Sequence, residues 1–165
     1  MNRRRSARDR PRAAPSGGRL AALKRAHAAG PAPHTPRTED YTEVIYELIS
    51  AKGYARIVDI GGHLAVGSPT VTKTIQRMHE EGLVHYERYR GVVLTDRGVR
   101  LARDIKRRHD VVAAFLRRMG LDEATVHRDT EGVEHHLAPE TLDRIARLVA
   151  YADAHPEWWD RFRTT

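Results

Sequence analysis

Apolar side chains recur at helical spacing through most of the chain after residue 37. The first three helices are predicted over residues 38–53, 56–64 and 68–82. Thr38 and Ser68 are the expected N-caps of the first and third helices, and Pro69 fits the first helical position after Ser68. The apolar positions that define these helices are Tyr41, Val44, Ile45, Leu48, Ile49, Ile57, Ile60, Leu64, Val71, Ile75 and Met78. Each set lies on one helical face, so the three helices are expected to share a core.

The second and third helices are separated by a tight turn, Ala65 to Gly67, and two short strands follow, Leu83 to Glu87 and Val92 to Leu94. The strands are joined by a basic turn, Arg88 to Gly91, that can lie along the minor groove of a duplex. Helix, helix, glycine turn, helix and basic hairpin is the order of a winged helix-turn-helix. Ordinary surface polarity explains each piece by itself, but it explains the ordered set poorly.

This region is therefore predicted to bind double-stranded DNA. The outer face of the third helix carries hydrogen-bonding side chains that suit phosphates and base edges, and the hairpin turn adds cations. The predicted DNA-binding residues are Ser68, Pro69, Thr70, Thr72, Lys73, Gln76, Arg77, Arg88, Tyr89 and Arg90.

The C-terminal part of the chain is predicted to be helical throughout. Thr95 is expected to cap a long helix over residues 96–119, which carries the winged region away from a second unit, and Gly120 closes that helix. Asp122 starts a further helix that runs through His136.

A last helix is predicted from Pro139 to the His155-Pro156 pair. Its apolar positions are Leu142, Ile145, Leu148 and Val149. Trp158, Trp159 and Phe162 then form a short aromatic tail that is expected to pack back on the second unit. The predicted fold class is therefore mostly α, with an N-terminal winged helix-turn-helix domain joined by a long helix to an all-α domain.

The positive charge of the chain is concentrated near its N-terminus. The formal net charge is +7, and residues 1–37 hold ten Lys/Arg against a single acid, Asp9. This segment is rich in Pro, Ala and Gly and poor in large apolar side chains, a composition typical of disorder. It is either an arm that adds salt-dependent, sequence-independent DNA affinity, or a solubilising extension or misassigned start. The predicted division is a disordered basic tail, 1–37, a winged helix-turn-helix domain, 38–95, and a helical domain, 96–165.

The absence of cysteine restricts the chemistry that the chain can support. It excludes disulfides, Cys-based zinc sites and iron–sulfur clusters, so any metal must be held by oxygen and imidazole nitrogen. No apolar run approaches the length that spans a bilayer, and the N-terminal arginines are not followed by the apolar core of a secretory signal. We therefore expect a cytoplasmic protein without a membrane partner.

Residues 129–137 hold an unusual group of charged side chains. Glu131, Glu134 and His135, at i, i+3 and i+4, share one face of the predicted helix. Two carboxylates and an imidazole on one stripe repel each other unless they hold a cation, so metal binding is the first hypothesis. Taken alone, Asp40 and Glu43 on the first helix are better explained as a solvated acidic face near a helix N-terminus.

Five motifs of this chain together resemble the manganese branch of the diphtheria toxin repressor family. They are Asp40-x-x-Glu43, Ala65-Val…Pro69-Thr-Val-Thr-Lys73, Tyr89-Arg-Gly-Val-Val-Leu-Thr95, Arg108-His109 and Glu131-Gly-Val-Glu-His-His136. The resemblance covers about residues 38–155. The chain stops too soon for the SH3-like third domain of the longer iron-sensing relatives, so no such domain is expected.

The resemblance implies a homodimer with a two-metal site between the winged domain and the dimerisation helices. Position by position, it implies the ligands Asp40, Glu43, His109, Glu131, Glu134 and His135. The iron-sensing branch has sulfur-containing residues at the positions of Asp40 and Glu131, whereas both are carboxylates here. Oxygen-rich sites suit Mn²⁺. The implied cofactor is Mn²⁺, two ions per protomer, with Fe²⁺, Co²⁺, Zn²⁺ or Cd²⁺ as substitutes.

The function implied by the resemblance is that of a manganese-responsive transcriptional repressor of metal-ion transport genes. Metal binding would fix the dimer in one conformation that fits a pseudo-palindromic operator. Two alternatives remain at this point. One is a metal-independent winged-helix DNA-binding protein whose acidic face is only structural. The other is a two-metal hydrolase, for which the sequence offers no separate catalytic motif, so no catalytic residue is predicted.

Overall fold

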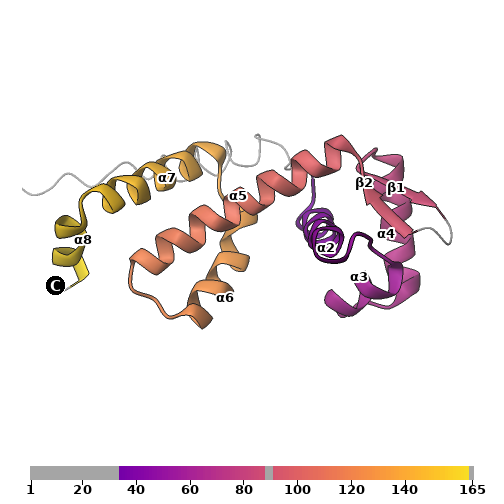
Figure 1. Ribbon diagram of the computed structural model, residues 1–165, viewed down its shortest axis with the longest axis horizontal. Helices are drawn as coiled ribbons and strands as arrows, with labels where there is room; N and C mark the ends of the chain where they lie inside the picture. The colour runs from indigo at the N-terminus through magenta and orange to yellow at the C-terminus, as the bar shows by residue number, and fades with distance from the viewer. Residues whose placement is uncertain (1–33, 88–90, 164–165) are drawn as a thin grey trace, which may run out of the picture. The chain divides into compact units, whose positions relative to one another are not determined.

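The computed structural model describes residues 34–87 and 91–163 (Figure 1). The helices and strands follow the predicted order. They are α2 (Pro36–Lys52), α3 (Ile57–His63), α4 (Ser68–Glu80), β1 (Val84–Glu87), β2 (Gly91–Leu94), α5 (Asp96–Arg118), α6 (Glu123–Val133), the short 3-10 helix η1 (Glu134–His136), α7 (Pro139–Ala154) and α8 (Pro156–Arg163). Residues 88–90 of the predicted basic turn and residues 1–33 of the predicted tail lie outside the described residues.

The winged part is built around one apolar core. Helices α2, α3 and α4 supply most of its side chains, and the antiparallel β1–β2 hairpin closes it, with Val84 paired to Leu94 and Glu87 to Gly91. The buried residues are Tyr41, Ile45, Leu48, Ala55, Ile60, Val71, Ile75, Met78, Leu83, Val84 and Val92. The core faces predicted from helical spacing in α2, α3 and α4 are therefore confirmed.

Two predicted N-caps are wrong. Helix α2 is capped by Thr35, whose hydroxyl accepts a hydrogen bond from the Thr38 N–H at 3.2 Å, and Pro36 takes the first helical position. Thr38 therefore lies inside the first turn. Helix α4 is capped by Gly67, whose carbonyl accepts from the N–H groups of Thr70 and Val71, while the Ser68 side chain makes no capping bond. Thr35-Pro36 predicts the start of α2 better than Thr38 does, because the fixed φ of proline suits the first turn of a helix.

The long helix α5 is joined tightly to the hairpin. Thr95 caps it as predicted, because its hydroxyl accepts from the Gly98 N–H at 3.1 Å and donates to the Gly82 carbonyl at 2.8 Å. A Cβ atom at Gly98 would collide with the backbone carbonyl of Leu83. A larger side chain would push α5 off the hairpin, so this position requires glycine.

The helical part differs from the prediction at two places. Helix α6 starts after Asp122 as predicted but ends at Val133, and the chain continues as the 3-10 helix η1. Gly132 is a weak helix former, and Pro139 disfavours helical geometry at Ala138, which is extended with ψ 148°. The second difference is that α7 is not the last helix, because Pro156 begins α8.

The aromatic tail packs back only in part. Trp159 is buried, and its indole N–H donates to the Arg118 carbonyl at the end of α5. Trp158 and Phe162 remain 39% and 50% exposed.

None of the helices formed by the described residues is long and apolar enough to cross a membrane.

Candidate metal centre

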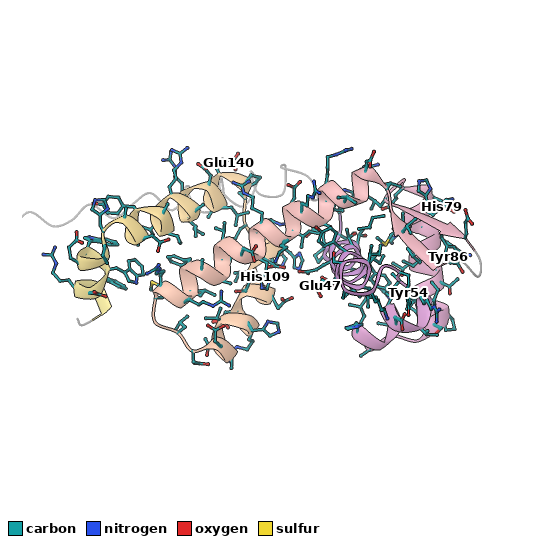
Figure 2. The ribbon with its side chains drawn as sticks, viewed as in Figure 1. Glu47, Tyr54, His79, Tyr86, His109 and Glu140 are labelled. Carbon is teal, nitrogen blue, oxygen red and sulfur yellow. The ribbon has the colours of Figure 1, made fainter. Side chains whose placement is uncertain are left out.

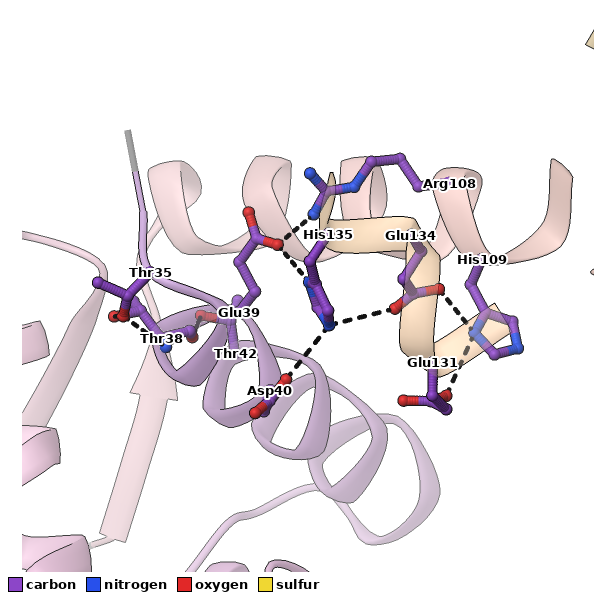
Figure 3. Close-up of polar contacts among 10 residues, drawn as sticks. All are labelled: Thr35, Thr38, Glu39, Asp40, Thr42, Arg108, His109, Glu131, Glu134 and His135. Carbon is purple, nitrogen blue, oxygen red and sulfur yellow. Dashed lines mark hydrogen bonds and ion pairs between the residues drawn. The ribbon is translucent and has the colours of Figure 1, made fainter. Parts of the chain in front are cut away.

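The predicted ligands lie on α2, α5, α6 and η1, and Figure 3 shows five of the six, all except Glu43. Asp40 and Glu43 lie on α2 and His109 lies on α5. Glu131 belongs to the last turn of α6, whereas Glu134 and His135 belong to η1. The three residues therefore do not lie on one continuous α-helix as predicted, although Glu131 and Glu134 both face His109. The tighter turn of η1 directs Glu134 to His109 and His135 to α2 (Figure 3).

Three of the predicted residues form a compact group. His109, Glu131 and Glu134 each offer a ligand atom, and these atoms lie within 4.8 Å of one another. His109 Nδ1 is 3.0 Å from Glu134 Oε2 and 3.5 Å from Glu131 Oε1. The Glu134 side chain is fully buried, and its other oxygen, Oε1, has no hydrogen-bond partner.

His135 links this group to α2. Its Nε2 atom lies 3.4 Å from Asp40 Oδ1 and 3.6 Å from Glu134 Oε1. Glu43 forms no hydrogen bond or ion pair with the other five, but it is half-buried and close enough to Glu134 and Glu131 for their charges to act on it. The structure thus brings five of the six predicted residues into contact and places the sixth within electrostatic range.

Two further residues, Glu39 and Arg108, belong to this centre, and neither was predicted from the sequence as a site residue. Glu39 is 4% exposed. Its Oε2 atom accepts a hydrogen bond from Arg108 Nη2 at 2.5 Å and lies 2.7 Å from His135 Nδ1 (Figure 3). In the sequence, Glu39 resembles any first-turn acid favoured by the helix dipole. Its partners lie 69 and 96 residues away, so no local spacing could have indicated them.

The electrostatics of the centre disfavour ionised carboxylates. Burial raises the pKa of Glu134, and the charge of Glu131 raises it further, although His109 acts in the opposite direction. Burial likewise raises the pKa of Glu43, with Glu134 and Glu131 adding to the effect. The pKa of Asp40 is raised by burial and by Glu131, against the lowering effect of His135. A nearby cation would favour the ionised form of each of these carboxyl groups and lower its pKa.

The residues present fit a divalent metal. The donors are carboxylate oxygens and imidazole nitrogens, which suit a first-row ion such as Mn²⁺. A buried carboxylate oxygen without a partner is costly unless a proton or a cation satisfies it. Glu134 Oε1 is such an atom, and it faces the Nε2 atom of His135.

The raised pKa values predict an unusual pH dependence for the metal-free protein. A carboxyl whose pKa is higher in the folded state stabilises the fold below its unfolded pKa, and this contribution is lost as the pH rises through the folded value. For Asp40, Glu43 and Glu134 the loss begins above their ordinary values of 3.8 and 4.5. We expect the melting temperature of the chelator-treated protein to fall as the pH rises above these ordinary values. Manganese should reverse the trend, because protons compete with the metal for the same oxygens. Parallel pH trends with and without the metal would contradict this account.

The predicted DNA-binding face is exposed along α4. Ser68, Pro69, Thr70, Lys73, Gln76 and Arg77 are all exposed. Thr72 is half-buried, and its hydroxyl donates to the Ser68 carbonyl at 2.9 Å, so only its lone pairs remain for a ligand. Arg77 Nη2 donates to the Thr38 hydroxyl at 3.3 Å, which connects this face to the first turn of α2. Arg37, Lys73 and Arg77 line one groove together with a single acid, Glu80.

Known protein families match both halves of the chain. Residues 34–92 match the family described as iron dependent repressor, N-terminal DNA binding domain. Residues 95–158 match the family described as iron dependent repressor, metal binding and dimerisation domain.

Individual relatives lead to the same assignment. The HTH-type transcriptional regulator MntR of Lysinibacillus sphaericus is 44% identical over 123 residues, which cover 74% of this chain and 88% of the relative. MntR of Bacillus subtilis is 46% identical over 117 residues, covering 71% of this chain and 82% of the relative. A solved structure of the manganese regulator SloR superposes with a TM-score of 0.62 at 27% identity, covering 72% of this chain and 55% of that one. The chain therefore spans about half the length of that larger protein.

These relatives are transcriptional regulators, which confirms the predicted winged helix-turn-helix class and the prediction that the chain is not an enzyme. DNA binding, divalent metal binding and dimerisation follow from the two matched domains. The chain belongs to the iron-dependent repressor family, also called the diphtheria toxin repressor family, and within it to the manganese branch.

Proposed function

We propose that this protein is a manganese-responsive repressor that binds operator DNA as a homodimer. The observation that carries the proposal is the buried Glu134, whose unpartnered oxygen lies where α2 of the winged part meets η1 of the helical part. A metal bound at this junction can affect the position of the DNA-binding helices, because the residues of the centre belong to both the winged part and the helical part.

The proposed ligands divide between the two parts of the chain. Asp40 and Glu43 come from α2, and the others come from the helical part, namely His109, Glu131, Glu134 and His135. Without a cation, the four carboxylates repel one another across the junction. Bound Mn²⁺ would supply the positive charge that offsets this repulsion. Asp40 and Glu43 would then hold α2 against η1 and narrow the range of positions open to α4.

The DNA-binding part of the proposal rests on the exposed side chains of α4. In a symmetric dimer two copies of α4 face successive major grooves, which fits a pseudo-palindromic operator. The proposed DNA contacts are Ser68, Pro69, Thr70, Thr72, Lys73, Gln76 and Arg77, together with Arg88, Tyr89 and Arg90 of the hairpin turn, and residues 1–37 as an additional basic arm. The target genes would be those of metal-ion transport, and the site of action the cytoplasm.

The stoichiometry and the metal preference also belong to the proposal. The resemblance to the manganese branch implies two Mn²⁺ ions per protomer, and the four carboxylates among the six proposed ligands carry enough negative charge to balance two divalent ions. Fe²⁺, Co²⁺, Zn²⁺ and Cd²⁺ are expected to compete, because imidazole and carboxylate ligands accept all of them and affinity rises along the first row.

The decisive experiment is a DNA-binding titration with and without metal. The full chain is titrated against its own upstream DNA and against metal-transporter promoters, in Mn²⁺ and in chelator, with fluorescence anisotropy as the readout. We expect binding in Mn²⁺ to be about 5- to 150-fold tighter, since couplings of this kind are typically 1–3 kcal/mol. Equally tight binding in chelator would instead identify a metal-independent winged-helix protein.

A further inference from the structure

We propose that Glu39 is a positioning residue for the metal centre, which fixes the ring of His135 so that its Nε2 atom faces Asp40 and Glu134. This inference rests on the proposed metal-binding function. It concerns a carboxylate that is part of the centre but is not one of the proposed ligands. Arg108 completes the arrangement by holding Glu39 from the other side.

The distances around His135 identify which ring nitrogen carries the proton. Nδ1 lies 2.7 Å from Glu39 Oε2, a normal length for a charge-assisted hydrogen bond. Nε2 lies 3.4 Å from Asp40 and 3.6 Å from Glu134, both too long for good hydrogen bonds. The proton of the neutral ring therefore belongs on Nδ1, where it is donated to Glu39. The lone pair on Nε2 then points toward two carboxylate oxygens, an arrangement that suits a cation.

Glu39 is poorly placed to bind a metal itself. Its Oε2 atom already accepts from both Arg108 and His135, and its side chain is only 5% exposed. The guanidinium of Arg108 lies 2.5 Å from the same oxygen and places a positive charge beside Glu39. A carboxylate that accepts a hydrogen bond from Nδ1 also makes the imidazole a better ligand through Nε2, as in the carboxylate–histidine–metal arrangements of other metal sites.

The hydrogen-bonded series of side chains Arg108, Glu39 and His135 has a second consequence. It joins α5, α2 and η1 through side-chain contacts that do not involve the proposed ligand oxygens (Figure 3). Arg108 directly precedes His109, so one turn of α5 both anchors Glu39 and presents a proposed ligand. The centre is therefore partly assembled before a metal binds, and the loss of Glu39 should weaken metal binding without removing a ligand.

The test compares Glu39→Gln and Glu39→Leu with the wild type and with a matched control, Glu140→Gln. Glu140 is an exposed carboxylate in the first turn of α7 (Figure 2). Two quantities are measured on the full chain: the protonation of the His135 ring nitrogens by ¹⁵N NMR in chelator, and Mn²⁺ affinity by calorimetry. We expect Nδ1–H in the wild type and Nε2–H in Glu39→Leu. Mn²⁺ affinity should fall about 10- to 100-fold in Glu39→Leu, less in Glu39→Gln, and not at all in the control.

Either of two results would overturn the proposal: a neutral His135 ring protonated on Nε2 in the wild type, or Mn²⁺ binding by folded Glu39→Leu that equals the wild type. If circular dichroism shows that Glu39→Leu is unfolded, the wild-type ring spectrum and the affinity of Glu39→Gln decide the question. A wild type that does not bind Mn²⁺ contradicts the proposed function instead. The ring spectrum in chelator still reports on Glu39 in that case, so the two failures can be distinguished.

Discussion

Replacing Glu134 by glutamine is expected to abolish the response to manganese while making the metal-free protein more stable. Glu134 is fully buried, and burial raises its pKa. The ionised carboxylate therefore destabilises the metal-free fold at neutral pH, and the uncharged amide removes that cost while preserving the shape of the side chain. The melting temperature in chelator should rise, by about 2–4 °C for each kcal/mol gained.

The same substitution removes the central ligand of the proposed metal site. Loss of a direct ligand should weaken Mn²⁺ binding by more than the roughly 10- to 100-fold typical of residues that only support ligands. Calorimetry with Mn²⁺ and DNA binding in Mn²⁺ and chelator measure this effect. Glu140→Gln, which removes an exposed carboxylate, should change neither quantity. A Glu134→Gln protein that is destabilised in chelator and still responds to Mn²⁺ would show that Glu134 is a structural residue only.

Substitutions on α4 are expected to separate two kinds of DNA contact. Lys73 and Gln76 are both exposed on the face of α4 that points away from the core. A lysine suits a phosphate, whereas a glutamine can read the edge of an adenine through two hydrogen bonds. We expect Gln76→Ala to weaken operator binding by about 10- to 100-fold and to leave random DNA unaffected. Lys73→Ala should weaken binding to all duplexes and reduce the salt slope by about one.

The control for these variants is Arg128→Ala, which removes an exposed cation from α6. It should leave both the operator affinity and the salt dependence unchanged. The measurements are anisotropy titrations in saturating Mn²⁺ over a range of salt concentrations. If Gln76→Ala binds operator and random DNA with the same affinities as the wild type, α4 does not read bases through this residue.

The order of the elements could be predicted from local sequence alone. Apolar spacing located the cores of α2 and α4, and Thr95 and Asp122 marked the starts of α5 and α6. The errors fell at helix ends, where Thr35 rather than Thr38 caps α2 and where α6 gives way to η1 after Val133. Both boundaries differ from the prediction by three residues. Such boundaries depend on a few competing backbone hydrogen bonds, so errors of about two to four residues are expected from local reasoning.

The sequence by itself determined the chemical character of the metal centre. With no cysteine in the chain, a metal must be held by carboxylates and imidazoles, and the segment Glu131 to His135 supplies both. Only the tertiary structure decided how they are arranged. The turn of η1 directs Glu134 toward α5 and His135 toward α2. Glu39 is buried between Arg108 and His135, which lie 69 and 96 positions away from it in the sequence. Helical periodicity describes neighbours within one element, whereas these contacts depend on how separate elements pack, which no local spacing records.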